Sequence, residues 1–217
     1  MSDIAATIFI IDDHPVMRMG LTCLINSAEG MRVIGEAGSA GEALGKLDEI
    51  DPPDLILVDV SLPDQNGLEL LKELKLLCPD SYALVISSHD EEVYAERVLR
   101  AGGRGYITKD RAPEKLVEAV RQVLSGGIFL SQAMTAKMME VFAGGEATGS
   151  SVSSLTDREL EVYRLIGEGD ISREIAAKLG VSVRTIDAHR THIKDKLGLR
   201  DAAELSYRAI RWVESQS

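Results

Sequence analysis

Along the first 126 residues, short unbroken apolar runs alternate with segments in which apolar residues recur at helical spacing. The runs lie at 7–12, 31–36, 54–59, 82–87 and 104–108. Such runs are typical of strands covered on both faces, as in a parallel sheet. Helical segments follow each run: one begins at Pro15, and the others lie at 39–50, between Leu68 and Pro79, at 90–102 and at 113–126. Five repeats of strand and helix predict a doubly wound α/β domain, a five-stranded parallel sheet of flavodoxin-like topology with helices on both faces.

The pattern changes after Gly126 and Gly127. Residues 132–142 predict a short connecting helix, and the small polar residues at 144–154 predict a flexible linker. Beyond them only helical periodicity appears, in segments that run from Thr156 to Gly167 and over 171–179, 183–197 and 201–214. Thr156, with Glu159 three residues later, is typical of a capping box. We therefore expect three parts: a first domain at 1–127, a connecting segment at 128–153, and a small all-α domain at 154–217.

Polar side chains stand at the carboxyl ends of four of the five expected strands. They are Asp12 and Asp13, Asp59, Ser87, and Lys109. In the doubly wound order 2-1-3-4-5, the first and third strands are neighbours at the point where ligands bind, so the three acids should converge. Carboxylates so close repel one another, and a hard divalent cation such as Mg²⁺ relieves that repulsion through oxygen ligands.

These residue types suit the transfer of a phosphoryl group. We expect Asp59 to receive it and to ligate Mg²⁺ together with Asp13 and the Ser61 backbone carbonyl, while Asp12 acts through water. Lys109 and the metal would neutralise charge on the group in transfer, and Ser87 would donate its hydroxyl to a phosphate oxygen. Taken singly, each of these is an ordinary cap, turn or surface residue, but their joint occurrence at one edge of a sheet favours the functional interpretation.

The second domain has the pattern of a helix-turn-helix unit. Apolar residues lie on one side of each of two helices around the turn at 180–182; they are Ile175, Ala176 and Leu179, then Val183, Ile186, Ile193 and Leu197. The opposite face of the second helix carries Arg184, Ala188, Thr191, His192 and Asp195, with Asp187 and Lys194 at its edge. These side chains could reach base edges, while Arg173, Lys178 and Arg190 could lie near phosphates. An amphipathic bundle with a solvated face would show the same spacing.

Charge separates the two parts of the chain. The protein has 24 basic and 35 acidic residues, net −11. Residues 151–217 hold 11 of each, so the first 150 residues hold the remaining 13 and 24 and carry the whole imbalance. Within the second part, 172–200 holds seven basic and three acidic residues, which favours a polyanionic partner. Cys23 and Cys78 lie far apart, and no apolar run is long enough to span a bilayer, so we expect a cytoplasmic protein without a membrane partner.

Four stretches identify the first domain by resemblance: IIDDHP at 10–15, LILVDVSLPDQNGLELL at 55–71, VISSHD at 85–90 and GYITKD at 105–110. They resemble the receiver domain of two-component response regulators. The resemblance implies that a sensor histidine kinase phosphorylates Asp59 in the presence of Mg²⁺, and that Ser87 and Tyr106 are the switch pair. It places Ser61 and His89 where the family tunes dephosphorylation. Position 88 is Ser, where the family more often has Ala or Gly.

LTDREL at 155–160 and the stretch at 171–199 are similar to the LuxR-type DNA-binding domain, and the whole chain resembles the NarL/FixJ class of response regulators. The resemblance implies double-stranded DNA as a partner and a homodimer formed on phosphorylation or DNA binding. We expect DNA contacts from Arg184, Thr185, Asp187, Ala188, Arg190, Thr191 and Lys194. We expect the dimer to form through the last helix, with Leu205, Ala209, Trp212 and Val213. RNA polymerase is a further candidate partner.

Asp187 departs from the family pattern, which often has a basic or neutral residue there. A carboxylate at this position could accept from the N4 amino group of cytosine. It could instead pair with Arg190 or Arg184 and hold a guanidinium ready for a phosphate, which is the interpretation we favour because it needs no particular DNA sequence.

Other classes of protein fit the first domain less well. A phosphatase or phosphotransferase with an aspartyl nucleophile would need a second acid two residues later, where Ser61 stands. A flavin-binding electron carrier would need a phosphate cradle in the first loop, which is acidic here. A receiver that no longer takes phosphate would lack some of the key residues, all of which are present. We expect no catalysis beyond Mg²⁺-dependent phosphorylation and dephosphorylation of the chain itself.

Overall fold

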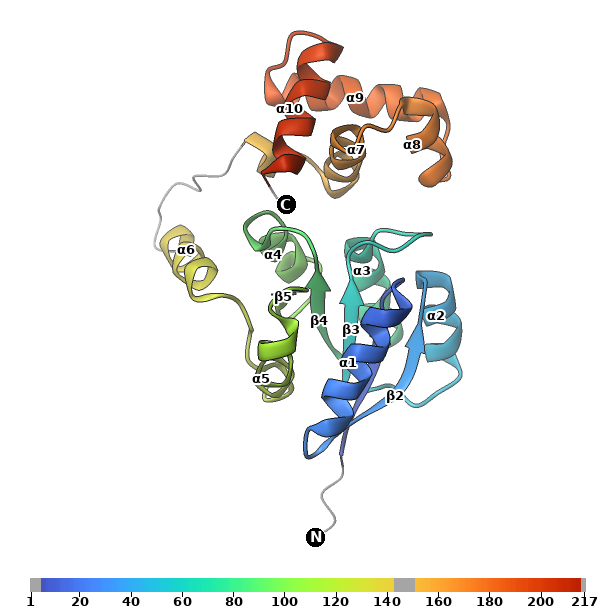
Figure 1. Cartoon of the computed structure of the whole chain (residues 1–217), viewed down its shortest axis with the longest axis vertical. Coiled ribbons are helices and arrows are strands. Elements are labelled where there is room, and N and C mark those ends of the chain that lie inside the picture. Colours follow the sequence, from blue (N-terminus) through green and yellow to red (C-terminus); the bar gives the residue numbers. More distant parts are fainter. Residues whose placement is uncertain (1–4, 143–150, 216–217) are drawn as a thin grey trace. The chain divides into compact units, whose positions relative to one another are not determined.

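The computed structural model describes residues 5–142 and 151–215 (Figure 1). They belong to two compact units that divide between Ala143 and Gly144. Among the described residues, no helix has both the length and the apolar character needed to cross a membrane.

The first unit is a five-stranded parallel sheet with helices on both faces. Its strands are β1 (Ala6–Ile11), β2 (Met31–Ala37), β3 (Leu55–Asp59), β4 (Tyr82–Ser87) and β5 (Tyr106–Thr108). Its helices are α1 (Pro15–Ser27), α2 (Ala40–Asp48), α3 (Gly67–Leu77), α4 (Glu91–Arg100), α5 (Ala112–Leu124) and α6 (Gln132–Phe142). The strand order is β2-β1-β3-β4-β5, which confirms the topology predicted from the sequence.

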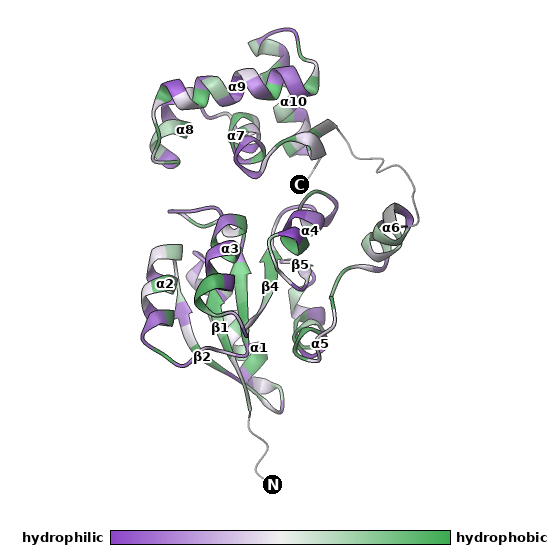
Figure 2. Ribbon diagram, turned by 180° about the vertical axis from the view of Figure 1, so that it is seen from behind, coloured by the Kyte–Doolittle hydropathy of each residue, from purple (hydrophilic) through white to green (hydrophobic). Residues whose placement is uncertain are grey.

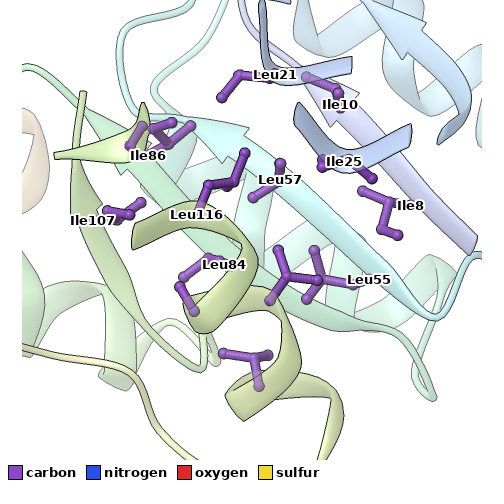
Figure 3. Close-up of a cluster of buried hydrophobic side chains, with 14 of the residues drawn as sticks. Ile8, Ile10, Leu21, Ile25, Leu55, Leu57, Leu84, Ile86, Ile107 and Leu116 are labelled. Atoms are coloured by element: carbon purple, nitrogen blue, oxygen red, sulfur yellow. The ribbon is translucent and has the colours of Figure 1, made fainter. Parts of the chain in front are cut away.

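The core lies between the central strands and the helices that cover them. On one face, strand residues such as Ile8, Leu57 and Leu84 pack against Leu21 of α1 and Leu116 of α5 (Figure 3). Alternate strand residues point to the other face and are buried as well, and this explains why the apolar runs are unbroken. In Figure 2 the central strands β1, β3 and β4 have the green of hydrophobic residues, whereas the helices around them carry both green and purple. A fully buried Leu or Ile side chain contributes about 1.5–3 kcal/mol, so these strand ends are held firmly.

The expected connecting helix, α6, packs on α4 rather than standing free. Its residue Met134 is buried, Lys137 lies 2.9 Å from the Glu92 carboxylate, and the Ser131 backbone N–H donates to Glu91 Oε1 at 2.7 Å. Within the described residues the first unit therefore includes α6, which lies after the boundary expected at residue 127.

The second unit is a helical bundle. It contains the short 3₁₀ helix η1 (Ser151–Ser154), then α7 (Asp157–Gly167), α8 (Ser172–Lys178), α9 (Val183–Leu197) and α10 (Ala202–Glu214). The capping box at Thr156 and Glu159 is present, with bonds in both directions. Its core includes Leu160, Ile175, Ile186 and Leu205, all at most 1% exposed.

Two expectations for this unit need correction. The end of the predicted linker, 151–154, is η1, in which Val152 is buried, so ordered structure begins before residue 154; residues 144–150 lie outside the described residues. Val183 was expected on the apolar side of its helix but is 42% exposed. Val183 is the first residue of α9, directly after the cap residue Ser182. At this end of the helix its side chain is not covered by the core of the unit.

Candidate functional site

The carboxyl ends of β1 and β3 bring the three predicted acids together. Asp12 is fully buried and Asp59 is 1% exposed. Asp12, Asp13, His14 and Asp59 each offer a ligand atom, and these atoms lie within 4.8 Å of one another. The convergence predicted from the sequence is therefore confirmed. The sequence did not predict that His14 belongs to this cluster. The His14 side chain is exposed, and it reaches the acids only because of the way the chain turns after β1.

Lys109 links two of these acids. Its ammonium lies 2.7 Å from Asp12 Oδ2 and 2.7 Å from Asp59 Oδ2, and it donates a hydrogen bond to the latter. The other oxygen of Asp59 accepts from the Ser61 backbone N–H at 3.1 Å. Burial raises the pKa of Asp59 to about 6, although the charge and hydrogen bond of Lys109 act in the opposite direction. Burial opposes the charge of Lys109 too, but the carboxylates of Asp59 and Asp12 raise the pKa of its ammonium above the usual value.

The acid cluster has unused capacity for a cation. Asp12 Oδ2 and Asp13 Oδ1 are buried and receive no directed hydrogen bond within the described part of the chain. Their neighbours are the Lys109 ammonium and, 2.5 Å from Asp13 Oδ1, the His14 ring Nδ1. Three carboxylates against one lysine leave a net negative charge at a partly buried site, and oxygen ligands of this kind suit a hard divalent ion.

The loop after Asp59 is closed by a tight backbone contact between Gly67 and residues 59–60. The Gly67 backbone N–H donates to the Val60 carbonyl at 2.9 Å, and α3 begins there. A Cβ at position 67 would lie 2.3 Å from the Asp59 carbonyl oxygen, so only glycine fits. The same loop is tied to α2, because Asp64 accepts the backbone N–H groups of Ala40 and Gly41 at 2.9 Å each.

The expected switch pair meets at His89. Ser87 is fully buried, and its Oγ accepts the His89 backbone N–H at 3.2 Å. The Tyr106 hydroxyl donates to the His89 carbonyl at 2.7 Å, and burial raises the pKa of this phenol, so it remains a donor. The His89 ring in turn contacts the Ser61 hydroxyl, at 2.9 Å from Nε2, and stacks on Tyr94 with ring centroids 5.0 Å apart. One residue thus contacts both Ser87 and Tyr106 and the loop that carries Ser61.

Helix α9 presents the expected DNA-binding side chains. Ser182 caps it by accepting the Thr185 N–H at 3.1 Å, and Gly198 ends it with a φ of 64°. Ile186 and Ile193 are fully buried on one side. On the other side, Arg184, Thr185, Asp187, Ala188 and Thr191 are exposed, while Arg190 and Lys194 are half-buried.

Within the described residues no ion pair joins Asp187 to Arg184 or Arg190, so the pairing that we favoured stays a prediction for the DNA-bound protein. The Asp187 carboxylate stays on the exposed side of α9. Its backbone carbonyl accepts the Thr191 hydroxyl at 3.0 Å.

Buried Glu159 anchors α9 to α7. Its carboxylate accepts from Lys196 at 2.6 Å and from the Thr156 backbone N–H at 2.8 Å, and it lies 4.0 Å from the His192 ring. Burial opposes ionisation, but these hydrogen bonds hold the pKa of Glu159 below its usual range. The sequence suggested only the cap.

The structure corrects the expected dimer residues. Leu205 and Ala209 are fully buried in the core of their own unit, where α10 packs on α7. Trp212 and Val213 are half-buried, and the Trp212 ring lies 5.5 Å from that of Tyr163. The exposed large hydrophobic side chains of α10 are instead Tyr207 and Ile210, 65% and 41% exposed.

These two sites, an acid cluster at the switch point of a parallel sheet and an outward helix after a tight turn, define a regulator that receives a signal on one unit and binds DNA with the other. The response regulator receiver domain family model matches residues 8–121. The model of the bacterial regulatory proteins of the luxR family matches residues 153–209. The chain belongs to the two-component response regulators with a LuxR-type DNA-binding domain.

Similar proteins agree with this family over nearly the whole chain. The oxygen regulatory protein NreC of Staphylococcus haemolyticus is 36% identical over 210 residues, which are 94% of this chain and 96% of that protein. RcsB from Salmonella enterica serovar Typhimurium, bound to promoter P1flhDC with the phosphomimetic BeF3⁻, is 26% identical with a TM-score of 0.72, covering 97% of this chain and 98% of that one. A LuxR-family response regulator from Aurantimonas sp. SI85-9A1 is 31% identical with a TM-score of 0.58, over 64% of this chain and 99% of that one.

Proposed function

We propose that Asp59 accepts a phosphoryl group from a sensor histidine kinase, and that this modification controls sequence-specific DNA binding by α9 and so transcription. The observation that carries the proposal is the position of Lys109, with its ammonium 2.7 Å from both Asp12 and Asp59. A cation so placed can shift from carboxylate to phosphoryl oxygens without leaving the site.

Transfer needs few further groups. An Asp59 oxygen forms the new O–P bond as the bond from phosphorus to the kinase histidine nitrogen breaks, and that nitrogen takes up the electron pair. Lys109 and Ser87 stabilise charge on the phosphoryl oxygens. Asp13, Asp59 and the Ser61 carbonyl would hold Mg²⁺, with Asp12 acting through water; the bound ion supplies additional neutralisation of the phosphoryl charge.

Several partners follow from this role. The kinase must approach the acid cluster, and beside it α1 exposes Val16 and Met19, 80% and 70% accessible, which would suit an apolar helix of the kinase. For a homodimer on DNA we propose Tyr207 and Ile210 of α10, with Trp212 and Val213 at the margin; a similar structure contains RcsB dimers on DNA. RNA polymerase remains a candidate partner. A cytoplasmic location fits a protein that must meet both a kinase and DNA.

Phosphorylation from a small donor tests the acceptor. Acetyl phosphate with Mg²⁺ should add one phosphate to the intact protein, seen by intact-mass analysis, and EDTA should prevent it. Asp59→Asn should take up none. Asp51→Asn, a change of the same type at an exposed loop residue, should behave like the wild type. Equal incorporation in Asp59→Asn and wild type would overturn the assignment.

The DNA-binding half of the proposal has its own test. The phosphorylated full chain should bind its DNA sites more tightly than the unphosphorylated chain in fluorescence anisotropy titrations. Arg184→Ala and Thr191→Ala on the exposed side of α9 should weaken both states. Binding that is indifferent to phosphorylation would contradict the proposed control.

A further inference from the structure

Arg18 is not one of the clustered residues, but its side chain binds the backbone between Asp12 and Asp13. It is the fourth residue of α1, at the end of the first turn, and its side chain is 20% exposed. Its guanidinium Nη1 donates to the Asp12 backbone carbonyl at 2.5 Å. That carbonyl belongs to the peptide that joins Asp12 to Asp13, so the bond fixes the orientation of the unit that carries both carboxylates.

The guanidinium is itself held on its other side. Arg18 Nε lies 3.6 Å from Glu36 Oε2 at the end of β2, and Glu36 Oε1 accepts the Thr22 hydroxyl at 2.6 Å. A Cβ added at Gly38 would lie 3.4 Å from Arg18 Nη1, so the planar group occupies the space above that glycine. Arg18 therefore lies between the loops after β1 and β2 in a restrained orientation.

A second hydrogen bond restrains Asp12 from within the loop at residues 12–14. The His14 backbone N–H donates to Asp12 Oδ1 at 2.7 Å. Asp12 is thus held at its side chain from within the loop and at its backbone carbonyl by Arg18. Without the Arg18 bond the Asp12–Asp13 peptide would lose one of the restraints on its orientation, and the relative placement of the two carboxylates would be less well defined.

We propose that Arg18 is a positioning residue that holds the Asp12–Asp13 peptide in the conformation that binds Mg²⁺ and supports phosphorylation of Asp59. This inference rests on the function proposed above. For a variant without the Arg18 charge, the positioning role and simple electrostatics predict opposite changes in Mg²⁺ affinity. Removal of a positive charge near a cation site should tighten Mg²⁺ binding, whereas loss of a positioning bond should weaken it.

Calorimetric titration of the full chain with Mg²⁺ separates these effects. We expect Arg18→Gln to raise the Mg²⁺ dissociation constant about tenfold. Arg18→Lys should recover part of the affinity, because an ammonium can still donate to the Asp12 carbonyl. Arg32→Gln removes the same charge from an exposed position on β2, and Thr22→Val removes a contact to Glu36 without touching Asp12; both should bind as the wild type does.

A measurement without metal completes the test. In the metal-free protein, amide hydrogen exchange at His14 should be faster in Arg18→Gln than in wild type, while exchange in β4 stays the same. Unchanged or tighter Mg²⁺ binding in Arg18→Gln would refute the positioning role, as would an equal loss in Thr22→Val. If wild-type protein itself binds no Mg²⁺, the proposed function fails instead, so the two failures are distinguishable.

Discussion

Asp59→Asn should stabilise the metal-free first unit. The residue Asp59 is 1% exposed, and burial raises the pKa of its carboxyl group from 3.8 to about 6. A carboxyl with this change in pKa lowers the free energy of unfolding at pH 7.5 by about 3 kcal/mol relative to its uncharged form. Asparagine has the same shape without the charge and can still accept a hydrogen bond from Lys109. We therefore expect the variant to be more stable by about 1–3 kcal/mol in EDTA.

The stability difference between Asp59→Asn and the wild type should depend on pH and on Mg²⁺. Because the pKa in the folded state lies above that of the unfolded chain, the wild type gains stability as pH falls through about 6, and the difference should vanish below about 4. Mg²⁺ binds the folded wild type and at 100 times its dissociation constant adds about 2.7 kcal/mol. Saturating Mg²⁺ should therefore remove or reverse the advantage of the variant.

Urea denaturation followed by far-ultraviolet circular dichroism measures the effect. The only tryptophan, Trp212, lies in the second unit, so its fluorescence identifies the transition that belongs to that unit. Asp51→Asn, at an exposed position, should change stability by less than about 0.5 kcal/mol. An Asp59→Asn protein that is equally or less stable in EDTA at pH 7.5 would refute the argument that burial disfavours the charge.

Four further outcomes are expected. Mg²⁺ affinity should fall about tenfold between pH 7 and pH 5 in calorimetric titrations, because protonation of Asp59 competes below its pKa of about 6; constant affinity would contradict this. Gly67→Ala should destabilise the first unit by about 1–3 kcal/mol in urea, since its Cβ would meet the Asp59 carbonyl. Glu159→Gln should lower the stability of the second unit by about 1–3 kcal/mol in Trp212 fluorescence, with a smaller loss as pH falls through the lowered pKa of Glu159. Asp187→Ala should relax preference at one base pair by roughly 1–3 kcal/mol in titrations against single-base variants; tighter binding to every site would mean that Asp187 only repels DNA.

Residue order along the chain predicted the acid cluster because parallel strands end at one edge of a sheet. Once strand order was inferred, Asp12, Asp13 and Asp59 had to meet, and no side-chain detail was needed. His14 and Arg18 could not be placed in the same way. Their contacts depend on the turn between β1 and α1 and on a side chain that reaches back over it, which sequence spacing does not determine.

The helical unit shows a different limit. An apolar stripe at helical spacing predicts that one side of α10 is covered, but not whether its own domain or a second copy covers it. Leu205 and Ala209 belong to the stripe that packs on α7, and the exposed large hydrophobic residues, Tyr207 and Ile210, lie on a side that the periodicity did not single out. For Asp187, spacing allowed an ion pair with Arg190, yet spacing places side chains near one another without fixing their rotamers.

For the expected switch pair, Ser87 and Tyr106, we propose a mechanism that starts from what His89 contacts in this structure. The Ser87 hydroxyl oxygen now accepts the His89 N–H, while the Tyr106 hydroxyl donates to the His89 carbonyl. A phosphoryl oxygen on Asp59 is a stronger acceptor for the Ser87 proton than any neutral neighbour, and the move of Ser87 toward it would lengthen the bond to His89. The backbone of His89 leads directly into Asp90, the cap of α4, and α4 holds α6 through Glu91 and Glu92. Under this mechanism, a charge added at Asp59 acts on α6, the helix that precedes the DNA-binding unit in the chain, through the loop that carries His89.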